Sequence, residues 1–137
     1  MKQVEELIRG ELSAIQSFDT VLSKINDLAE KERLTTIRAD HARAVDMLKK
    51  YAGSEDLQNA KDSGAWGAFA KAFAGGGSFF GDKAAIQALK VGEEHGLKEY
   101  KAALESKDIQ NELRQVIQSD LLPQQEQHIA TINGFLH

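Results

Sequence analysis

The segment IQALKVGEEHGLKEYKAAL (86–104) decides the fold, because its apolar residues recur at steps of three and four. That spacing places side chains on one face of an α-helix. Glu93 stands between Leu89 and Leu97, where a further apolar residue is expected. A carboxylate that faces a core needs a cation, a metal ion or hydrogen-bond donors. The rest of the chain must therefore supply a partner for Glu93.

Three other segments have the same helical spacing, and polar residues interrupt each of them: Glu11 in the first, His41 in the second, Gln125 and His128 in the last. The patterns and their capping residues predict helices over about residues 2–26, 29–52, 82–105 and 108–136. Pro123 falls inside the last of these helices. It lacks an N–H and crowds the carbonyl of residue 119, so we expect a kink or a break there.

The connection over residues 53–81 is long for a compact domain and contains GAWGAFAKAFAGGG (64–77). Trp66, Phe69 and Phe73 share one face of a predicted short amphipathic helix. Such a helix is marginal alone in water, so we expect it to lie across the bundle and bury those rings. An aromatic edge left exposed there predicts a homodimer formed through this crossover.

Composition limits the classes of function. The chain has 137 residues, which predicts a single domain over 1–137, and it contains no cysteine, which excludes disulfides and thiolate metal sites. Its net charge of −4 gives no electrostatic reason to bind nucleic acid or an anionic membrane. No apolar run is long enough to span a bilayer, and the first residues lack a signal-peptide core. We therefore expect a cytoplasmic protein.

Particular motifs resemble known families. LIRGELSAIQSF (7–18) resembles the first helix of bacterioferritins, in which the residue equivalent to Glu11 binds iron. RADHA (38–42) and QEQHI (125–129) are similar to the Glu-x-x-His motifs of the second and fourth helices, and both keep the histidine. GEEHGLKEYKAAL (92–104), with the glycine-rich crossover, more closely resembles the bacterial domain-of-unknown-function family 2383. The resemblance implies an all-α, ferritin-like four-helix bundle with a long crossover between its second and third helices.

The resemblance also implies a set of metal ligands, namely Glu11, His41, Glu93 and His128. Arg38 and Gln125 stand where the di-iron relatives have the glutamate of each Glu-x-x-His motif. Neither residue can supply a carboxylate, so a dinuclear ferroxidase centre is not expected. If a metal binds, we expect one iron, manganese or zinc ion.

A second interpretation needs no metal. Arg38 would neutralise Glu11 or Glu93, and the histidines would hydrogen-bond into the same buried network. We give this interpretation precedence, because Arg38 would supply the charge that the metal would otherwise supply. Counting along the helices also places Glu93 and His128 at levels about 10 Å apart, unless the Pro123 kink or helix tilt absorbs the difference.

Two hypotheses of function follow. The first is a non-enzymatic bundle with a degenerate di-iron site, which acts through self-association or partner binding. The alternative is a metal-binding protein with oxidase or storage chemistry at a mononuclear Glu/His site. No spacing of serine, histidine and aspartate suggests a hydrolase triad, so we assign no catalytic residue and no organic cofactor. His95 lies off the apolar series and is expected to be solvated.

Overall fold

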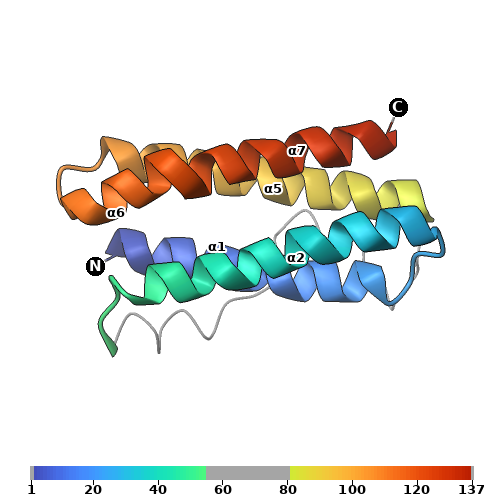
Figure 1. The fold of residues 1–137 in the computed structure, drawn as a ribbon, viewed down its shortest axis with the longest axis horizontal. Helices are drawn as coiled ribbons and strands as arrows, with labels where there is room; N and C mark the ends of the chain where they lie inside the picture. The colour runs from blue at the N-terminus through green and yellow to red at the C-terminus, as the bar shows by residue number, and fades with distance from the viewer. Residues whose placement is uncertain (1, 55–80, 137) are drawn as a thin grey trace.

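The computed structural model describes residues 2–54 and 81–136. These residues form α1 (Lys2–Leu22), α2 (Leu28–Lys49), α5 (Asp82–Glu105), α6 (Asn111–Val116), a π-helical turn η1 (Ile117–Leu121), and α7 (Leu122–Leu136). The segments α6, η1 and α7 follow one another without a gap, so the described chain makes four long helical rods (Figure 1). Neither described range contains a strand. The predicted all-α bundle is confirmed.

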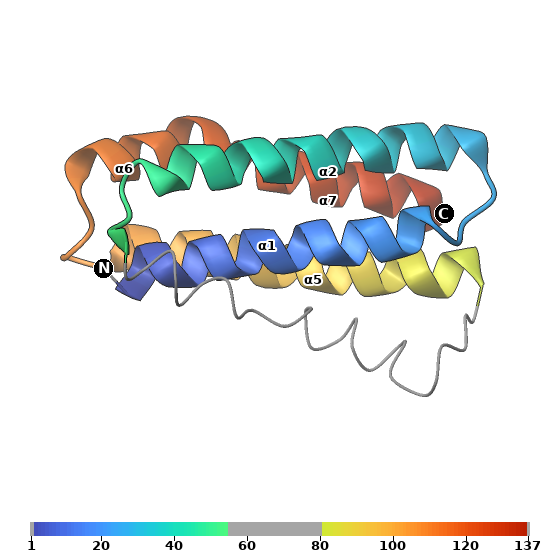
Figure 2. The ribbon, with the colours of Figure 1, turned by 90° about the horizontal axis from the view of Figure 1, so that it is seen from below.

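The rods are arranged as two antiparallel hairpins. One hairpin consists of α1 and α2, and the other consists of α5 and the α6–η1–α7 rod (Figure 1). The hairpins meet where α1 packs on α5, and this arrangement is clearest in the turned view (Figure 2). All four rods run close to one common axis, as the helices of a bundle do.

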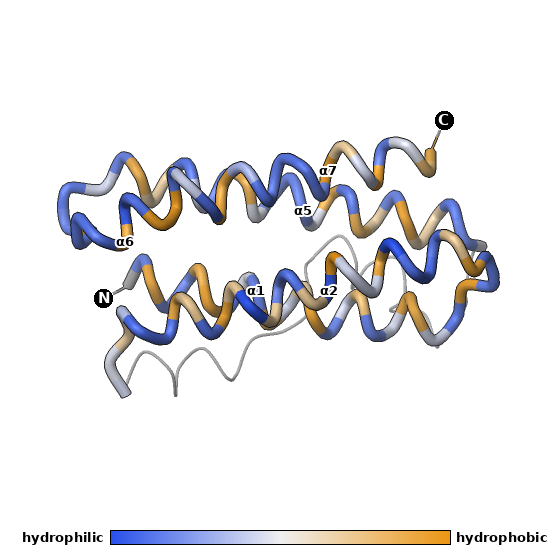
Figure 3. Tube along the Cα trace, in the orientation of Figure 1, coloured by the Kyte–Doolittle hydropathy of each residue, from blue (hydrophilic) through white to orange (hydrophobic). Residues whose placement is uncertain are grey.

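The core is divided into two hydrophobic clusters with a polar layer between them. One cluster includes Phe18, Leu34, Leu89 and Ile132, and the other includes Ile8, Leu48, Tyr100 and Ile117. On each rod a buried polar residue lies between members of the two clusters: Glu11, His41, Glu93, and the pair Gln125 and His128. Figure 3 shows how apolar and polar residues alternate along each rod. The interruptions found in the sequence therefore meet in one layer near the middle of the bundle.

The observed helix boundaries differ from the predicted ones by a few residues. The second helix begins after Asp27, whose side chain accepts a hydrogen bond from the Glu30 N–H at 2.9 Å, as the capping pattern predicts. The first helix ends at Leu22 instead of residue 26, and the second ends at Lys49 instead of 52. The last rod begins at Asn111 instead of 108, because residues 106–110 form the turn after α5.

The irregularity expected near Pro123 is present as the π turn η1. The Leu122 N–H donates to the carbonyl of Ile117, five residues earlier, instead of the residue four positions back. Pro123 is then the second residue of α7. A π turn accommodates one more residue than an α-helix over the same rise, so it changes which face of the rod the later residues occupy.

The predicted crossover lies almost wholly outside the described residues, and this includes Trp66, Phe69 and Phe73. The homodimer predicted from those rings therefore stays a prediction. Within 2–54 and 81–136, no helix has the length and apolar character that crossing a membrane requires.

Candidate metal centre

His41 joins two carboxylates in the polar layer. Its Nδ1 atom lies 2.7 Å from Oε2 of Glu11 on α1, and its Nε2 atom lies 2.5 Å from Oε1 of Glu93 on α5. The imidazole is 1% exposed and Glu93 is fully buried. Tyr100 extends the chain of contacts, because its hydroxyl donates to Oε1 of Glu11 at 2.8 Å. Side chains from three elements are thus connected through one ring.

Gln125 fixes the other side of Glu93. Its Nε2 atom donates to Oε2 of Glu93 at 2.5 Å and to the Glu93 backbone carbonyl at 2.9 Å. The amide approaches α5 over Gly96, where an added Cβ would lie 2.7 Å from the Gln125 Nε2 atom. Glycine at position 96 therefore leaves the space through which Gln125 reaches Glu93.

His128 completes the layer from α7. Its Nε2 atom lies 3.0 Å from Oδ2 of Asp40 on α2, and its Nδ1 atom lies 3.5 Å from Oε2 of Glu93. The Nδ1 atom is buried and makes no hydrogen bond within the part of the chain that the structure describes. Buried polar atoms are nearly always paired, so this nitrogen is a position where a proton shared with Glu93 or a metal ion could be held.

The structure brings together three of the four predicted ligands. One ligand atom each from His41, Glu93 and His128 can be chosen so that all lie within 4.8 Å of one another. The imidazoles of His41 and His128 are inclined at 57°, with ring centroids 4.9 Å apart. Glu11 contacts the far nitrogen of His41 and lies outside this group of three. Glu93 and His128 meet at one level, and a π turn lies just before Pro123, where the sequence analysis allowed a kink to absorb the difference.

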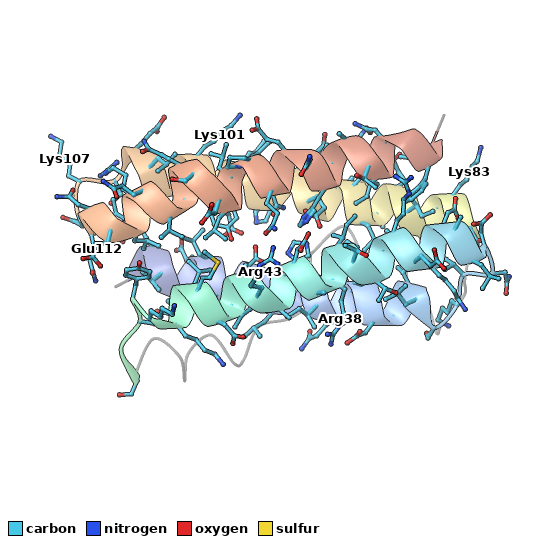
Figure 4. All side chains as sticks on the ribbon, viewed as in Figure 1. Arg38, Arg43, Lys83, Lys101, Lys107 and Glu112 are labelled. Carbon is cyan, nitrogen blue, oxygen red and sulfur yellow. The ribbon has the colours of Figure 1, made fainter. Side chains whose placement is uncertain are left out.

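Arg38 does not neutralise the buried carboxylates, so that part of the sequence interpretation was wrong. Its side chain is 37% exposed and pairs with Asp19 on α1 at 2.8 Å. Arg43, five positions later, lies on the opposite side of α2, toward α7, and pairs with Asp40 at 3.0 Å (Figure 4). The position one helical turn before His41 proved to lie at the outer edge of the bundle, where a long arginine reaches solvent.

The charges of the layer act mainly on His41 and Glu93. Burial alone would lower the pKa of His41, but the charges of Glu93 and Glu11 and their hydrogen bonds outweigh it and raise that pKa well above its ordinary value. Burial would raise the pKa of Glu93, but His41 and His128 reverse the effect and lower it. Burial and the neighbouring Glu11 raise the pKa of Tyr100. The layer therefore favours a cation at His41 between two carboxylates.

The donor set fits a transition-metal ion. Histidine ligands usually have the non-coordinating nitrogen held by a carboxylate, which fixes the tautomer and the ring orientation. Glu11 holds Nδ1 of His41 in this way, and Asp40 holds Nε2 of His128. The two remaining nitrogens face Glu93. Sequence reasoning missed Asp40, because it stands beside the helical face that carries His41 and interrupts no apolar series.

Comparison with known proteins identifies the family of the chain. No curated protein and no solved structure matches it. The sequence model of the family described as "Domain of unknown function (DUF2383)" matches residues 1–106, which include Glu11, His41 and Glu93. His128 and Gln125 lie beyond the matched region. The match covers well over half of the sequence, and the chain therefore belongs to the DUF2383 family.

Proposed function

We propose that the protein binds one divalent transition-metal ion, held by His41 Nε2, the Glu93 carboxylate and His128 Nδ1. The observation that carries the proposal is the buried Nδ1 of His128, which makes no hydrogen bond within the described residues and lies 3.5 Å from Oε2 of Glu93, while its Nε2 is held by Asp40. His41 has the matching arrangement, with Glu11 on its outer nitrogen and Glu93 on its inner one. Two imidazoles and a carboxylate suit iron, zinc or manganese.

Formal charge supports the proposal. With His41 doubly protonated, the buried group of Glu11, Glu93 and His41 carries a net charge of −1. A divalent ion that displaces the Nε2 proton brings this group to neutrality, which is favourable in a buried environment. Gln125 contributes no charge, so the group has no carboxylate to spare for a second ion.

A bound ion would supply Lewis-acid chemistry if it were zinc, and redox chemistry if it were iron or manganese. The residues of this chain define the surroundings of that ion. Gln125 holds one oxygen of Glu93, Tyr100 holds Glu11, and the two hydrophobic clusters exclude water from either end of the layer. These contacts orient the side chains around the site, and the hydrogen bond of 2.5 Å between His41 Nε2 and Glu93 Oε1 would have to open for an ion to bind both.

The alternative is a structural layer without metal, in which the His41 proton permanently joins Glu11 and Glu93. The contacts of 2.7 and 2.5 Å favour this arrangement for the protonated state. In that case the protein would act through partners, as the first sequence hypothesis holds. That hypothesis depends on the crossover, which lies outside the described residues.

Elemental analysis of protein purified without a histidine tag tests the proposal. We expect close to one iron, manganese or zinc ion per chain, and metal-depleted protein should bind one Co²⁺ or Zn²⁺ ion. His128→Ala should abolish this binding. His95→Ala is the matched control, because the His95 side chain is 63% exposed and its ion-pair contact, at 3.7 Å, is with Glu99 outside the proposed ligand set. Absence of stoichiometric binding by the wild-type protein would leave the structural layer as the function of these residues.

A further inference from the structure

The three residues of the proposed centre are nearly inaccessible to solvent. His41 is 1% exposed, Glu93 is 0% exposed and His128 is 4% exposed. An ion can therefore reach them only along a definite path between two helices. The cavities that touch the polar layer show which pairs of helices offer such a path.

A pocket between α2 and α7 reaches His128 directly. Its volume is about 300 Å³, and Asp40 and His128 are among its lining residues. Arg33 and Gln127, both exposed, lie on its α2 and α7 sides. Gln127 also lines a wider groove of about 820 Å³ farther along the same two helices, beside Arg43. The two hollows therefore adjoin along the α2–α7 face.

On the opposite face of the bundle, the described residues leave a much smaller cavity beside the polar layer. The cavity against Glu11, Tyr100 and Gln125 has a volume of only about 10 Å³, roughly that of one water molecule. A pocket of about 230 Å³ lies farther along the α1–α5 face, and Ala102 lines it, but it touches neither histidine of the centre. Among the cavities lined by residues 2–54 and 81–136, the α2–α7 pocket at His128 is thus larger than the cavity at Glu11 and Gln125.

We propose that the α2–α7 pocket is the route by which a divalent cation reaches and leaves the centre, with Asp40 as the carboxylate that receives the ion. This inference rests on the proposed metal-binding function. Asp40 suits the role because its side chain is 21% exposed and one of its oxygens already contacts the outer nitrogen of His128. It is the negatively charged group in the lining of this pocket, and carboxylate oxygen binds divalent cations readily.

Arg43 controls the route in this proposal. It donates to Oδ1 of Asp40 at 3.0 Å, while Oδ2 faces His128. While Arg43 is paired, the charge of Asp40 is neutralised and the positive Arg33 lies on the same pocket. An incoming cation is then repelled until Arg43 swings away. The Arg43 side chain is 60% exposed, so its departure into water requires no rearrangement of the core.

Site-directed labelling tests the route, because the sequence contains no cysteine and a single introduced thiol can be labelled alone. Gln127→Cys places the thiol on the α2–α7 pocket, and Ala102→Cys places it on the α1–α5 pocket as the matched control. Each metal-depleted variant is labelled with a bulky fluorescein maleimide or with the much smaller iodoacetamide. Uptake of Co²⁺ is then followed by visible absorption, and its release by transfer to a chelator.

We expect the bulky label at position 127 to slow Co²⁺ uptake at least tenfold, and the small label to have little effect. Protein loaded first and labelled afterwards should keep its ion and release it at least tenfold more slowly. Labels at position 102 should change neither rate. Equally fast uptake with the bulky label at 127, or a block at 102, would overturn the route and leave the centre itself intact. If the unlabelled variants and the wild-type protein bind no Co²⁺, the proposed function fails and this inference fails with it.

Arg43→Gln tests the control of the route. We expect uptake and release both to accelerate by about two- to fivefold, the factor that corresponds to the loss of an exposed ion pair, at unchanged stoichiometry. Arg38→Gln is the matched control, since Arg38 also stands on α2 and pairs with an exposed aspartate, but toward α1 (Figure 4). Equal rates in the Arg43 variant and the wild type would contradict the role of Arg43.

Discussion

The Nε2 atom of His41 lies 2.5 Å from the Oε1 atom of Glu93, and both residues are buried at the centre of the bundle. The same imidazole reaches Glu11 through its other nitrogen, so α2 is tied to both α1 and α5 by one ring. A cation located at this point, whether a proton or a metal ion, determines both the stability of the layer and its capacity to bind metal.

Replacement of His41 should destabilise the metal-free protein strongly. His41→Leu leaves Glu11 and Glu93 buried without their shared cation, and we expect a loss of about 3–5 kcal/mol in the free energy of unfolding. Urea denaturation in the presence of a chelator measures it. Arg38→Ala is the control and should lose less than about 1 kcal/mol, because its pair with Asp19 is solvated. Similar losses for the two variants would contradict the assignment of His41 as the internal cation.

The stability of the metal-free protein should fall at alkaline pH because of His41 and at acid pH because of Glu93. The pKa of His41 is raised in the folded state, so its contribution is complete below pH 6.5 and disappears as the pH rises through the higher folded pKa. The pKa of Glu93 is lowered, so its contribution is present above pH 4.5 and disappears as the pH falls through the lower folded pKa. Melting temperatures measured between about pH 2 and pH 10 should therefore decline at both ends, and His41→Leu should flatten the alkaline decline.

Affinity for metal should increase with pH. The ion must displace a proton from His41, whose pKa is raised well above its ordinary value. Below that folded pKa, we expect affinity for Zn²⁺ to increase by about tenfold per pH unit, with about one proton released per ion. Calorimetric titrations in two buffers of different ionisation enthalpy measure the released proton. An affinity that does not vary between pH 6 and pH 8 would show that the ion does not replace the His41 proton.

Gly96→Ala should disturb Glu93 through Gln125. The new methyl group would lie 2.7 Å from the Gln125 Nε2 atom, which is buried and makes two hydrogen bonds to Glu93. We expect a loss of about 1–3 kcal/mol in the free energy of unfolding, together with weaker metal binding. Gly134→Ala is the control, since a Cβ there meets nothing within 4 Å. The control should be neutral or should stabilise by up to about 1 kcal/mol.

Glu99 gives a pH effect of its own. Burial, with the charges of Glu6 and Glu11, raises its pKa to about 7. A raised carboxyl pKa means that the folded state holds its proton more tightly, so this residue makes stability fall as pH rises from about 4.5 to 7. Glu99→Gln should therefore stabilise the protein at pH 8, by roughly 0.5–1 kcal/mol after solvent screening, and have little effect at pH 4. Stabilisation of equal size at both pH values would exclude ionisation as the cause.

The fold was predictable from hydrophobic periodicity because every rod buries one face. Regular steps through residues such as Leu89 and Leu34 located the helices, and Asp27 marked the beginning of one of them. Helix ends were less predictable, because the helices pass into short turns. The backbone N–H groups of Ser23 and Tyr51 still make helix-like hydrogen bonds there. The predicted crossover lies almost wholly outside the described residues, so the structure does not test it.

The polar layer was predictable in part. Glu11, His41, Glu93 and His128 were identified because a polar residue in an apolar series must meet other polar groups. Arg38 was misassigned, since position along a helix does not fix the direction of a long flexible side chain. The level of His128 depended on a kink near Pro123, and the sequence gives the position of that proline but not the number of residues that the preceding turn accommodates.

The π turn makes the proposed centre depend on how a segment outside it is wound. Between Ile117 and Leu121 the rod holds a residue more than a regular α-helix would, and each residue turns a helix by about 100°. If the same residues wound as regular α-helix, Gln125 and His128 would rotate together by about 100°, away from Glu93, whereas removal of one residue from the turn would let regular winding keep them in place. Such a change of winding removes no ligand and touches no part of the polar layer. Two sequences that share all the residues of the centre can therefore differ in whether they assemble it, and a comparison of residue identities alone would not distinguish them.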